Sequence, residues 1–162
     1  MTVRRRGLAA GLAIAAVVGM LVLQLWQPPE PGAMLPSDGT MEAHVDVPGD
    51  VREILEDACA DCHSDRTRWP WYARISPVSW WVVGDVRHGR SNLDFDAWSR
   101  DPVAEPTPRQ RVEWMCRSVQ RDEMPPRAYR LLHREARLKD GEKMRLCEWS
   151  RRILRELGPG GR

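Results

Sequence analysis

The sequence carries little excess charge. It holds 25 basic and 23 acidic residues, and the part after residue 33 holds 22 of each. A protein that binds nucleic acid neutralises phosphates with a basic surface, so we expect no nucleic-acid partner. The chain is also poor in aromatic residues other than tryptophan, with one phenylalanine and two tyrosines beside eight tryptophans. Such large, flat side chains fill cores or wall a planar ligand.

Strand patterns and catalytic patterns are also missing. Apolar residues recur at helical spacing, and no convincing stretch alternates apolar and polar residues as a strand does. No nucleophile stands with a paired acid and base, so the sequence does not indicate an enzyme. We therefore predict an all-α fold with about four or five helices in its globular part.

The amino terminus has the pattern of a membrane anchor. Arg4-Arg5-Arg6 precede an uncharged stretch whose apolar part runs from Leu8 to Trp26. A helix of about 20 apolar residues spans a bilayer, and the arginines favour the cytoplasmic side. A cleaved signal peptide is the alternative, but its apolar core usually has only about 7–15 residues. We expect residues 1–26 to anchor the chain in the bacterial inner membrane, with the remainder in the periplasm.

A segment rich in proline and glycine follows the anchor. Residues 27–49 contain five prolines and three glycines and show no helical or alternating period. Such a composition is typical of a flexible tether. We therefore predict three parts: the anchor at 1–26, the tether at 27–49 and one globular domain at 50–158.

The most specific motif is Cys59-Ala60-Asp61-Cys62-His63. In an exported chain, Cys-x-x-Cys-His is typical of covalent haem attachment, in which both thiols form thioethers and the histidine binds iron. A zinc site would need a second ligand pair at close spacing, which the sequence lacks. A thiol redox pair would need alternating strands and helices. The motif therefore predicts one haem c held by Cys59, Cys62 and His63.

Helical periods surround this motif. Asp50 is the expected N-cap of a helix that leads into Cys59, and Ser76-Pro77 begins a second helix that ends near Gly89. Thr107-Pro108-Arg109-Gln110 has the pattern of a capping box before a third helix. The last helix spans about residues 140–157, where Gly158 and Pro159 stop it.

An aromatic loop, Thr67–Tyr72, follows the motif. Ordinary core packing and a wall of the haem pocket are both compatible with it. On the second interpretation Trp69, Trp71 and Tyr72, with Trp81 in the next helix, contact haem. Nearby arginines would reach the haem propionates: Arg66, Arg68 and Arg74. A backbone carbonyl of this loop could also accept the ring N–H of His63.

Met124 is the expected second iron ligand. It follows the helix at 107–121, stands before Pro125-Pro126 and lies 61 residues after His63. A thioether held by two prolines can be presented to iron, although Met124 could instead fill a gap in the core. Met115 sits in a helical apolar stripe and more naturally packs as core. His88 and His133 are weaker candidates for the sixth ligand.

Two further cysteines, Cys116 and Cys147, lie on separate predicted helices. Outside the cytoplasm such a pair often forms a disulfide. Each could equally be a small buried apolar residue. Both alternatives stay open at this point.

Taken together, the motifs resemble a family of small bacterial periplasmic haem-binding-domain proteins related to monohaem cytochromes c. The resemblance covers about residues 48–157 and the anchor-plus-tether layout. Its matching residues are Cys59, Cys62, His63, Ser64, Trp69, Pro70, Trp71, Tyr72, Pro77, Trp80, Trp81, Leu93, Phe95, Trp98, Glu123, Met124, Pro125, Tyr129, His133, Leu138 and Trp149. It implies one covalent haem c with His63 proximal and Met124 distal. It does not imply a physiological role, and His88 stands where relatives are expected to carry an acid.

The function that these features favour is one-electron transfer by a membrane-tethered periplasmic haem c protein with His/Met ligation. Its partners would be other redox proteins. A haem-based sensor or a peroxidase-like enzyme is the alternative, and it would need an open or labile site in place of Met124. A third possibility is an interaction module in which haem only holds the fold together.

Overall fold

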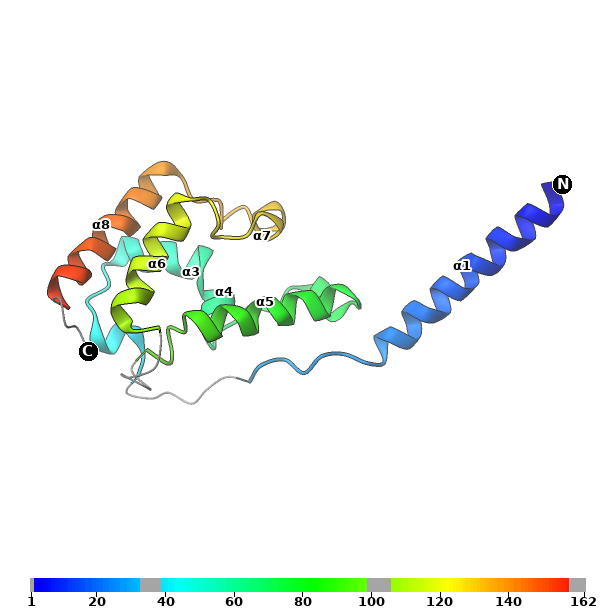
Figure 1. Cartoon of the computed structure of the whole chain (residues 1–162), viewed down its shortest axis with the longest axis horizontal. Coiled ribbons are helices and arrows are strands. Elements are labelled where there is room, and N and C mark those ends of the chain that lie inside the picture. Colours follow the sequence, from blue (N-terminus) through cyan, green and yellow to red (C-terminus); the bar gives the residue numbers. More distant parts are fainter. Residues whose placement is uncertain (1, 33–38, 99–105, 158–162) are drawn as a thin grey trace. The chain divides into compact units, whose positions relative to one another are not determined.

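The computed structural model describes residues 2–32, 39–98 and 106–157, without the side chains of residues 2–6. These ranges contain eight α-helices, one 3₁₀ helix and no strand, so the all-α prediction is confirmed (Figure 1). The elements are α1 Thr2–Gln24, α2 Met41–His44, α3 Gly49–Ala58, α4 Ala60–His63, η1 Trp71–Arg74, α5 Val78–Asn92, α6 Pro108–Gln120, α7 Arg127–Leu132 and α8 Asp140–Glu156.

The chain forms two compact units. The first comprises Met1–Pro31 with Trp69–Asp85, and the second comprises Gly32–Arg68 with Val86–Arg162. Helix α5 begins in the first unit and ends in the second. The sequence predicted one globular domain after the tether, whereas the structure groups the aromatic segment with the amino-terminal helix.

The first unit is built on α1. The window Gly7–Gln24 has a mean hydropathy of 2.1, and none of it is buried. By length and composition this helix can cross a bilayer. Its carboxyl-terminal end is bound by η1 and the start of α5: Gln24 Nε2 donates to the Arg74 carbonyl at 2.6 Å, and Trp80 Nε1 donates to the Trp26 carbonyl at 3.2 Å.

The second unit has its core between α3, α6 and α8. Their apolar stripes meet there, and Val112, Leu146 and Ile153 have no exposed surface. A disulfide between Cys116 and Cys147 joins α6 to α8, which resolves the alternative left open by the sequence. This cross-link and the apolar stripes fix the two longest helices of the unit against each other.

The predicted helix starts differ in two cases, and one of them is α5, which begins at Val78 and not at the predicted Pro77. Thr107 and Gln110 form the predicted capping box, in which the side chain of each accepts the backbone N–H of the other. Asp50, in contrast, is not an N-cap, because α3 begins one residue earlier and has Pro48 at that position. Asp50 instead lies in the first helical turn, where a carboxylate is favoured by the helix dipole.

The packed part of the second unit begins earlier than the predicted domain start at residue 50. Met41, Val45 and Val47 are buried in the core, and Trp149 Nε1 donates to the Asp46 carbonyl at 2.9 Å. Three apolar residues at uneven spacing give no period from which their burial could be predicted. Residues 33–38 of the predicted tether, and the predicted helix stop at Gly158-Pro159, lie outside the described residues.

Candidate functional site

The Cys-x-x-Cys-His motif folds as a tight turn directly after α3. Cys59 closes α3 by donating its N–H to the Leu55 carbonyl at 2.9 Å, and its own carbonyl accepts the N–H of His63 at 3.0 Å. One helical turn therefore carries both thiols and the imidazole. Neither Cys59 nor Cys62 forms a disulfide, whereas the other two cysteines are bonded to each other. Burial, with a smaller contribution from Cys62, raises the pKa of Cys59 to about 12, so its thiol stays protonated.

A cavity of about 240 Å³ lies beside this turn, with a mainly apolar lining. Cys59, His63 and Met124 all line it, so the structure brings together three of the residues that the sequence singled out. The rest of the lining comes from α5, α6 and adjoining residues: His88, Gly89, Asn92, Leu93, Arg111, Trp114, Met115, Ser118 and Val119.

The imidazole of His63 is held in one orientation. Its Nδ1 lies 2.8 Å from the Leu93 carbonyl oxygen. A carbonyl only accepts hydrogen bonds, so Nδ1 carries the proton and Nε2 keeps a lone pair for a metal. Burial lowers the pKa of His63, which favours this neutral form. The sequence placed the acceptor in the loop Thr67–Tyr72, and the structure places it instead after α5.

Gly89 allows α5 to approach the haem-motif turn. A Cβ atom at this position would lie 2.5 Å from the Cys62 carbonyl oxygen, which no side chain tolerates. The sequence predicted Gly89 as a helix end, but α5 continues to Asn92. The glycine is needed for a close backbone contact inside the helix, and this contact places Leu93 near His63.

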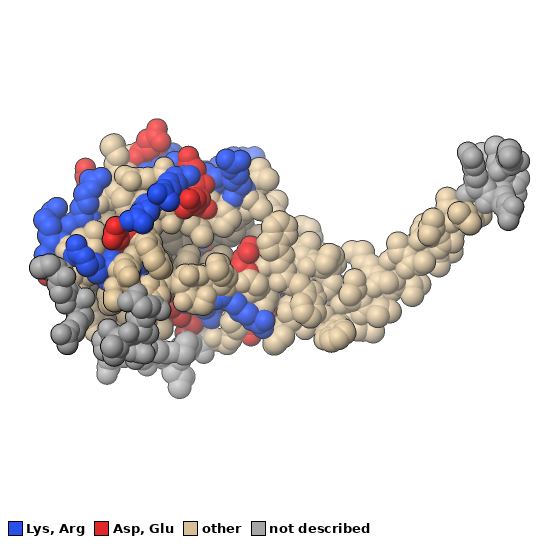
Figure 2. Space-filling view, viewed as in Figure 1, with Lys and Arg blue, Asp and Glu red and all other residues tan. Residues whose placement is uncertain are grey.

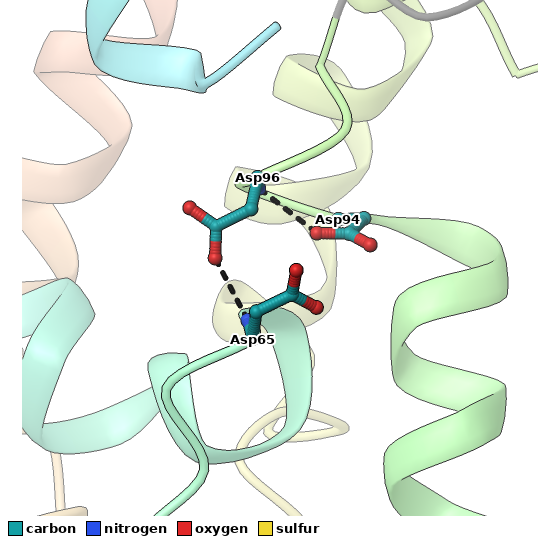
Figure 3. Close-up of side chains that lie close together, drawn as sticks. All are labelled: Asp65, Asp94 and Asp96. Carbon is teal, nitrogen blue, oxygen red and sulfur yellow. Dashed lines mark hydrogen bonds between the residues drawn. The ribbon is translucent and has the colours of Figure 1, made fainter. Parts of the chain in front are cut away.

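Three aspartates link the loop after α4 to the loop after α5 (Figure 3). The backbone N–H of Asp65 donates to Asp96 at 2.7 Å, and that of Asp96 donates to Asp94 at 2.8 Å. The carboxylates lie within 4.8 Å of one another, and Arg90 Nη1 lies 3.1 Å from Asp65. Burial and the two neighbouring carboxylates raise the pKa of Asp94. Arg90 supplies the positive charge that lets these groups lie so close.

This linkage reaches His63 through the backbone. The N–H of Phe95 donates to the His63 carbonyl at 2.8 Å. The segment Leu93–Asp96 is therefore bonded to both the side chain and the backbone of His63, and also to the N–H of Asp65. We infer that the three aspartates position the His63 ring by holding this segment.

Asp61 secures the motif from its other side. It is 7% exposed, and its carboxylate accepts hydrogen bonds from Tyr129 Oη at 2.6 Å and from Arg68 Nε at 3.0 Å. Burial alone would raise the pKa of Asp61, but the bonds from Arg68 and Tyr129 outweigh it and lower that pKa. Arg68, predicted to reach a propionate, has Asp61 as its partner. The sequence gives no local signal for the contact between Asp61 and Tyr129, which are 68 residues apart.

The other predicted haem contacts do not line the cavity. Trp69, Trp71, Tyr72 and Trp81 all belong to the first unit, and Trp71 and Trp81 are 76% and 63% exposed. Their contact with haem stays a prediction, as does that of the Cys62 thiol. His88 does line the cavity, whereas His133 does not. The ring of His133 stacks on Tyr129 at 4.1 Å and its Nδ1 lies 3.1 Å from Glu135.

Arg111, which the sequence analysis missed, tests whether the cavity suits a haem. This half-buried residue of α6 lines the cavity, and its Nε is buried without a hydrogen-bond partner in the described part of the chain. Burial lowers the pKa of Arg111, but a guanidinium stays charged in proteins. The charged Nε–H of Arg111, which has no partner in the described residues, suits a haem propionate. The imidazole and the thioether suit iron, and the thiols suit vinyl groups. The residues fit a haem.

Comparison with known proteins supports this fit. A family model described as a haem-binding domain matches residues 18–152. The match covers the haem motif and parts of both units. No curated protein and no solved structure matches the chain.

Proposed function

Given that the chain belongs to the haem-binding domain family, we propose that it is a membrane-tethered periplasmic one-electron carrier with a covalently attached haem c. The observation that carries this proposal is a single apolar cavity lined by Cys59, His63 and Met124. Bound haem iron supplies the exchange between Fe(II) and Fe(III). No paired acid and base is required of the protein for such a role.

Cys59 and Cys62 are the proposed attachment residues. Neither is part of a disulfide, and they are separated by one turn of α4. Each thiol would hold the haem by adding across one vinyl group, with its sulfur on one carbon and its hydrogen on the other, so no oxidant would be needed. The two thioethers would leave His63, the next residue, close to the iron.

His63 and Met124 are the proposed axial ligands. The Leu93 carbonyl orients the imidazole and, by accepting its N–H, makes Nε2 a stronger ligand. Met124 lines the same cavity and offers a thioether. Ligation by His and Met would raise the reduction potential.

Arg111 is the proposed partner of a propionate. Its Nη1 lies 3.2 Å from the Trp98 carbonyl, which leaves its buried Nε available. A hydrogen bond between a guanidinium and a carboxylate is charge-assisted and offsets the cost of burying both groups.

The proposed location follows from α1. The apolar window Gly7–Gln24 can cross the membrane, and the arginine cluster before it favours the cytoplasm. The haem domain would then lie in the periplasm, tethered to the inner membrane. Its partners would be redox proteins such as membrane oxidases or dehydrogenases.

A second candidate function has one observation in its favour. His88 lines the same cavity as His63, and Met124 is 37% exposed. A labile bond to Met124, with a polar group nearby, would suit a haem-based sensor or a peroxidase-like enzyme. The state of the sixth ligand distinguishes this function from electron transfer.

The test of covalent attachment is a pair of cysteine variants of the full chain, produced with c-type haem attachment machinery. Cys59→Ala with Cys62→Ala should remove all haem that survives denaturing electrophoresis. The matched control, Cys116→Ala with Cys147→Ala, removes the disulfide and should retain the haem. Haem that persists through denaturation in the first variant would contradict the attachment.

A further inference from the structure

Four tryptophans of the first unit lie largely on its surface. Trp26, Trp71, Trp80 and Trp81 are 73%, 76%, 46% and 63% exposed. Tryptophan usually buries most of its surface, so a gathering of exposed rings marks a contact surface. We call these four residues the tryptophan belt. All four belong to the same compact unit as α1.

The belt is tied to the carboxyl-terminal end of α1. Ser76 Oγ donates to the Leu23 carbonyl at 3.0 Å, and the Ser76 N–H donates to Gln24 Oε1 at 3.0 Å. Gln27 Nε2 in turn donates to Ser76 Oγ at 2.9 Å. The Leu23 carbonyl is one of the groups that a helix end leaves without an intrahelical partner. The segment Trp71–Trp81 therefore closes the end of the helix.

Aromatic packing continues this junction. The rings of Trp26 and Trp80 meet edge to face at 6.4 Å, and Trp80 Nε1 donates to the Trp26 carbonyl. Trp26 lies two residues beyond the apolar window that ends at Gln24. If that window crosses the hydrocarbon, Trp26 and Trp80 stand where hydrocarbon gives way to headgroups. Tryptophan is enriched at this level because its ring is apolar and its N–H is polar.

The charge pattern of the segment also suits lipid. Trp69–Gly84 contains a single charged residue, Arg74, although 30% of the whole chain is charged. Arg74 is exposed in the last turn of η1, where its side chain can reach a lipid phosphate. Figure 2 shows no charged residue along the described surface of α1, and the large apolar side chains of this helix from Leu8 to Leu23 are exposed.

From these observations we propose that the tryptophan belt lies in the headgroup region of the outer leaflet of the membrane that α1 crosses. The belt would fix the depth of the helix and hold the start of α5 at the membrane surface. This inference rests on the anchoring role of α1. It gives the aromatic motifs around Trp71 and Trp81 a lipid partner in place of the haem contact expected from the sequence.

The test is photo-crosslinking of the full haem-loaded chain in vesicles of phosphatidylethanolamine and phosphatidylglycerol. The lipids carry a diazirine near the glycerol end of one acyl chain, and crosslinked peptides are mapped by mass spectrometry. We expect crosslinks in α1 and also in Trp71–Trp81. The internal control is α7, where Leu131 and Leu132 are 74% and 66% exposed but belong to the other unit. This control should remain unlabelled, because exposure alone does not bring a residue to lipid.

The outcomes distinguish the anchoring of α1 in the membrane from the contact of the tryptophan belt with lipid. Crosslinks in α1 without any in Trp71–Trp81 would overturn the belt and leave the anchor intact. An absence of crosslinks in both segments would overturn the anchor and the belt together. Equal labelling of Trp71–Trp81 and α7 would also overturn the belt. In the variant Trp71→Ser with Trp81→Ser, labelling of Trp71–Trp81 should fall while labelling of α1 stays unchanged.

Discussion

Two tryptophans of the second unit and two of the first have opposite environments. Trp98 and Trp149 in the second unit are each 3% exposed, and Trp149 donates its indole N–H to the Asp46 carbonyl. Trp71 and Trp81 in the first unit keep most of their surface accessible. The abundance of tryptophan therefore does not indicate a single role. The rings of Trp98 and Trp149 form core, whereas those of Trp71 and Trp81 form part of a surface.

The difference lies in the residues around each ring. Trp149 stands on α8, where apolar residues recur at helical spacing between charged ones, so one face is buried. Trp81 stands in a segment with a single charge, where polar residues do not define a solvent face. Such a segment is apolar on most sides, and only a lipid or protein partner can cover it.

The largest stability difference is expected between matched tryptophan variants. Trp149→Ala should lower the free energy of unfolding by about 3–5 kcal/mol, because it leaves a cavity and removes the hydrogen bond to the Asp46 carbonyl. Trp81→Ala should change it by less than about 0.5 kcal/mol, since the ring is exposed. Denaturant unfolding of the full chain in detergent measures both. Equal losses would show that Trp81 is buried and would remove the contrast between the units.

The disulfide should stabilise the second unit by a similar amount. Cys116 and Cys147 are 31 residues apart, and closing a loop of this length contributes about 3–4 kcal/mol. The variant Cys116→Ala with Cys147→Ala should lose that stability while retaining covalent haem. Reduced wild-type protein serves as the control and should unfold at the same denaturant concentration as the variant. A variant as stable as the oxidised protein would contradict the cross-link.

A smaller effect is expected at the Asp61 network. Tyr129→Phe removes a hydrogen bond to a buried carboxylate and should cost about 1.5–3 kcal/mol. Asp61→Asn keeps an oxygen that can accept from Tyr129, so it should cost less than Asp61→Ala. The same unfolding measurement checks all three variants. If Tyr129→Phe were neutral, Tyr129 would not be holding the haem motif.

The sequence predicted those features that depend on local periods and local chemistry. The capping box at Thr107 and Gln110 is present, and α8 ends close to its predicted limit. The motif at residues 59–63 and Met124 could be predicted because thiol, imidazole and thioether groups are chemically distinctive. The structure places Cys59, His63 and Met124 on one cavity.

Contacts that depend on the backbone or on distant partners could not be predicted. The Leu93 carbonyl that accepts from His63 has no side-chain signature, because every residue carries a carbonyl. Gly89 looked like a helix end because the sequence does not reveal the nearby Cys62 carbonyl. Nothing in the sequence distinguishes Arg111 from the other arginines, because only the structure shows that its Nε is buried. The partner of the aromatic loop could not be predicted from composition alone, because tryptophan suits haem, core and membrane alike.

The measurement that tests the central claim most directly is the absorption spectrum of the haem-loaded full chain, recorded oxidised, reduced, and reduced with carbon monoxide. We predict a six-coordinate low-spin spectrum with a weak far-red band from methionine bound to ferric iron, unchanged by carbon monoxide. The variant Met124→Ala should lose that band and bind carbon monoxide. A high-spin wild-type spectrum, or an unaltered spectrum in Met124→Ala, would contradict ligation by His63 and Met124.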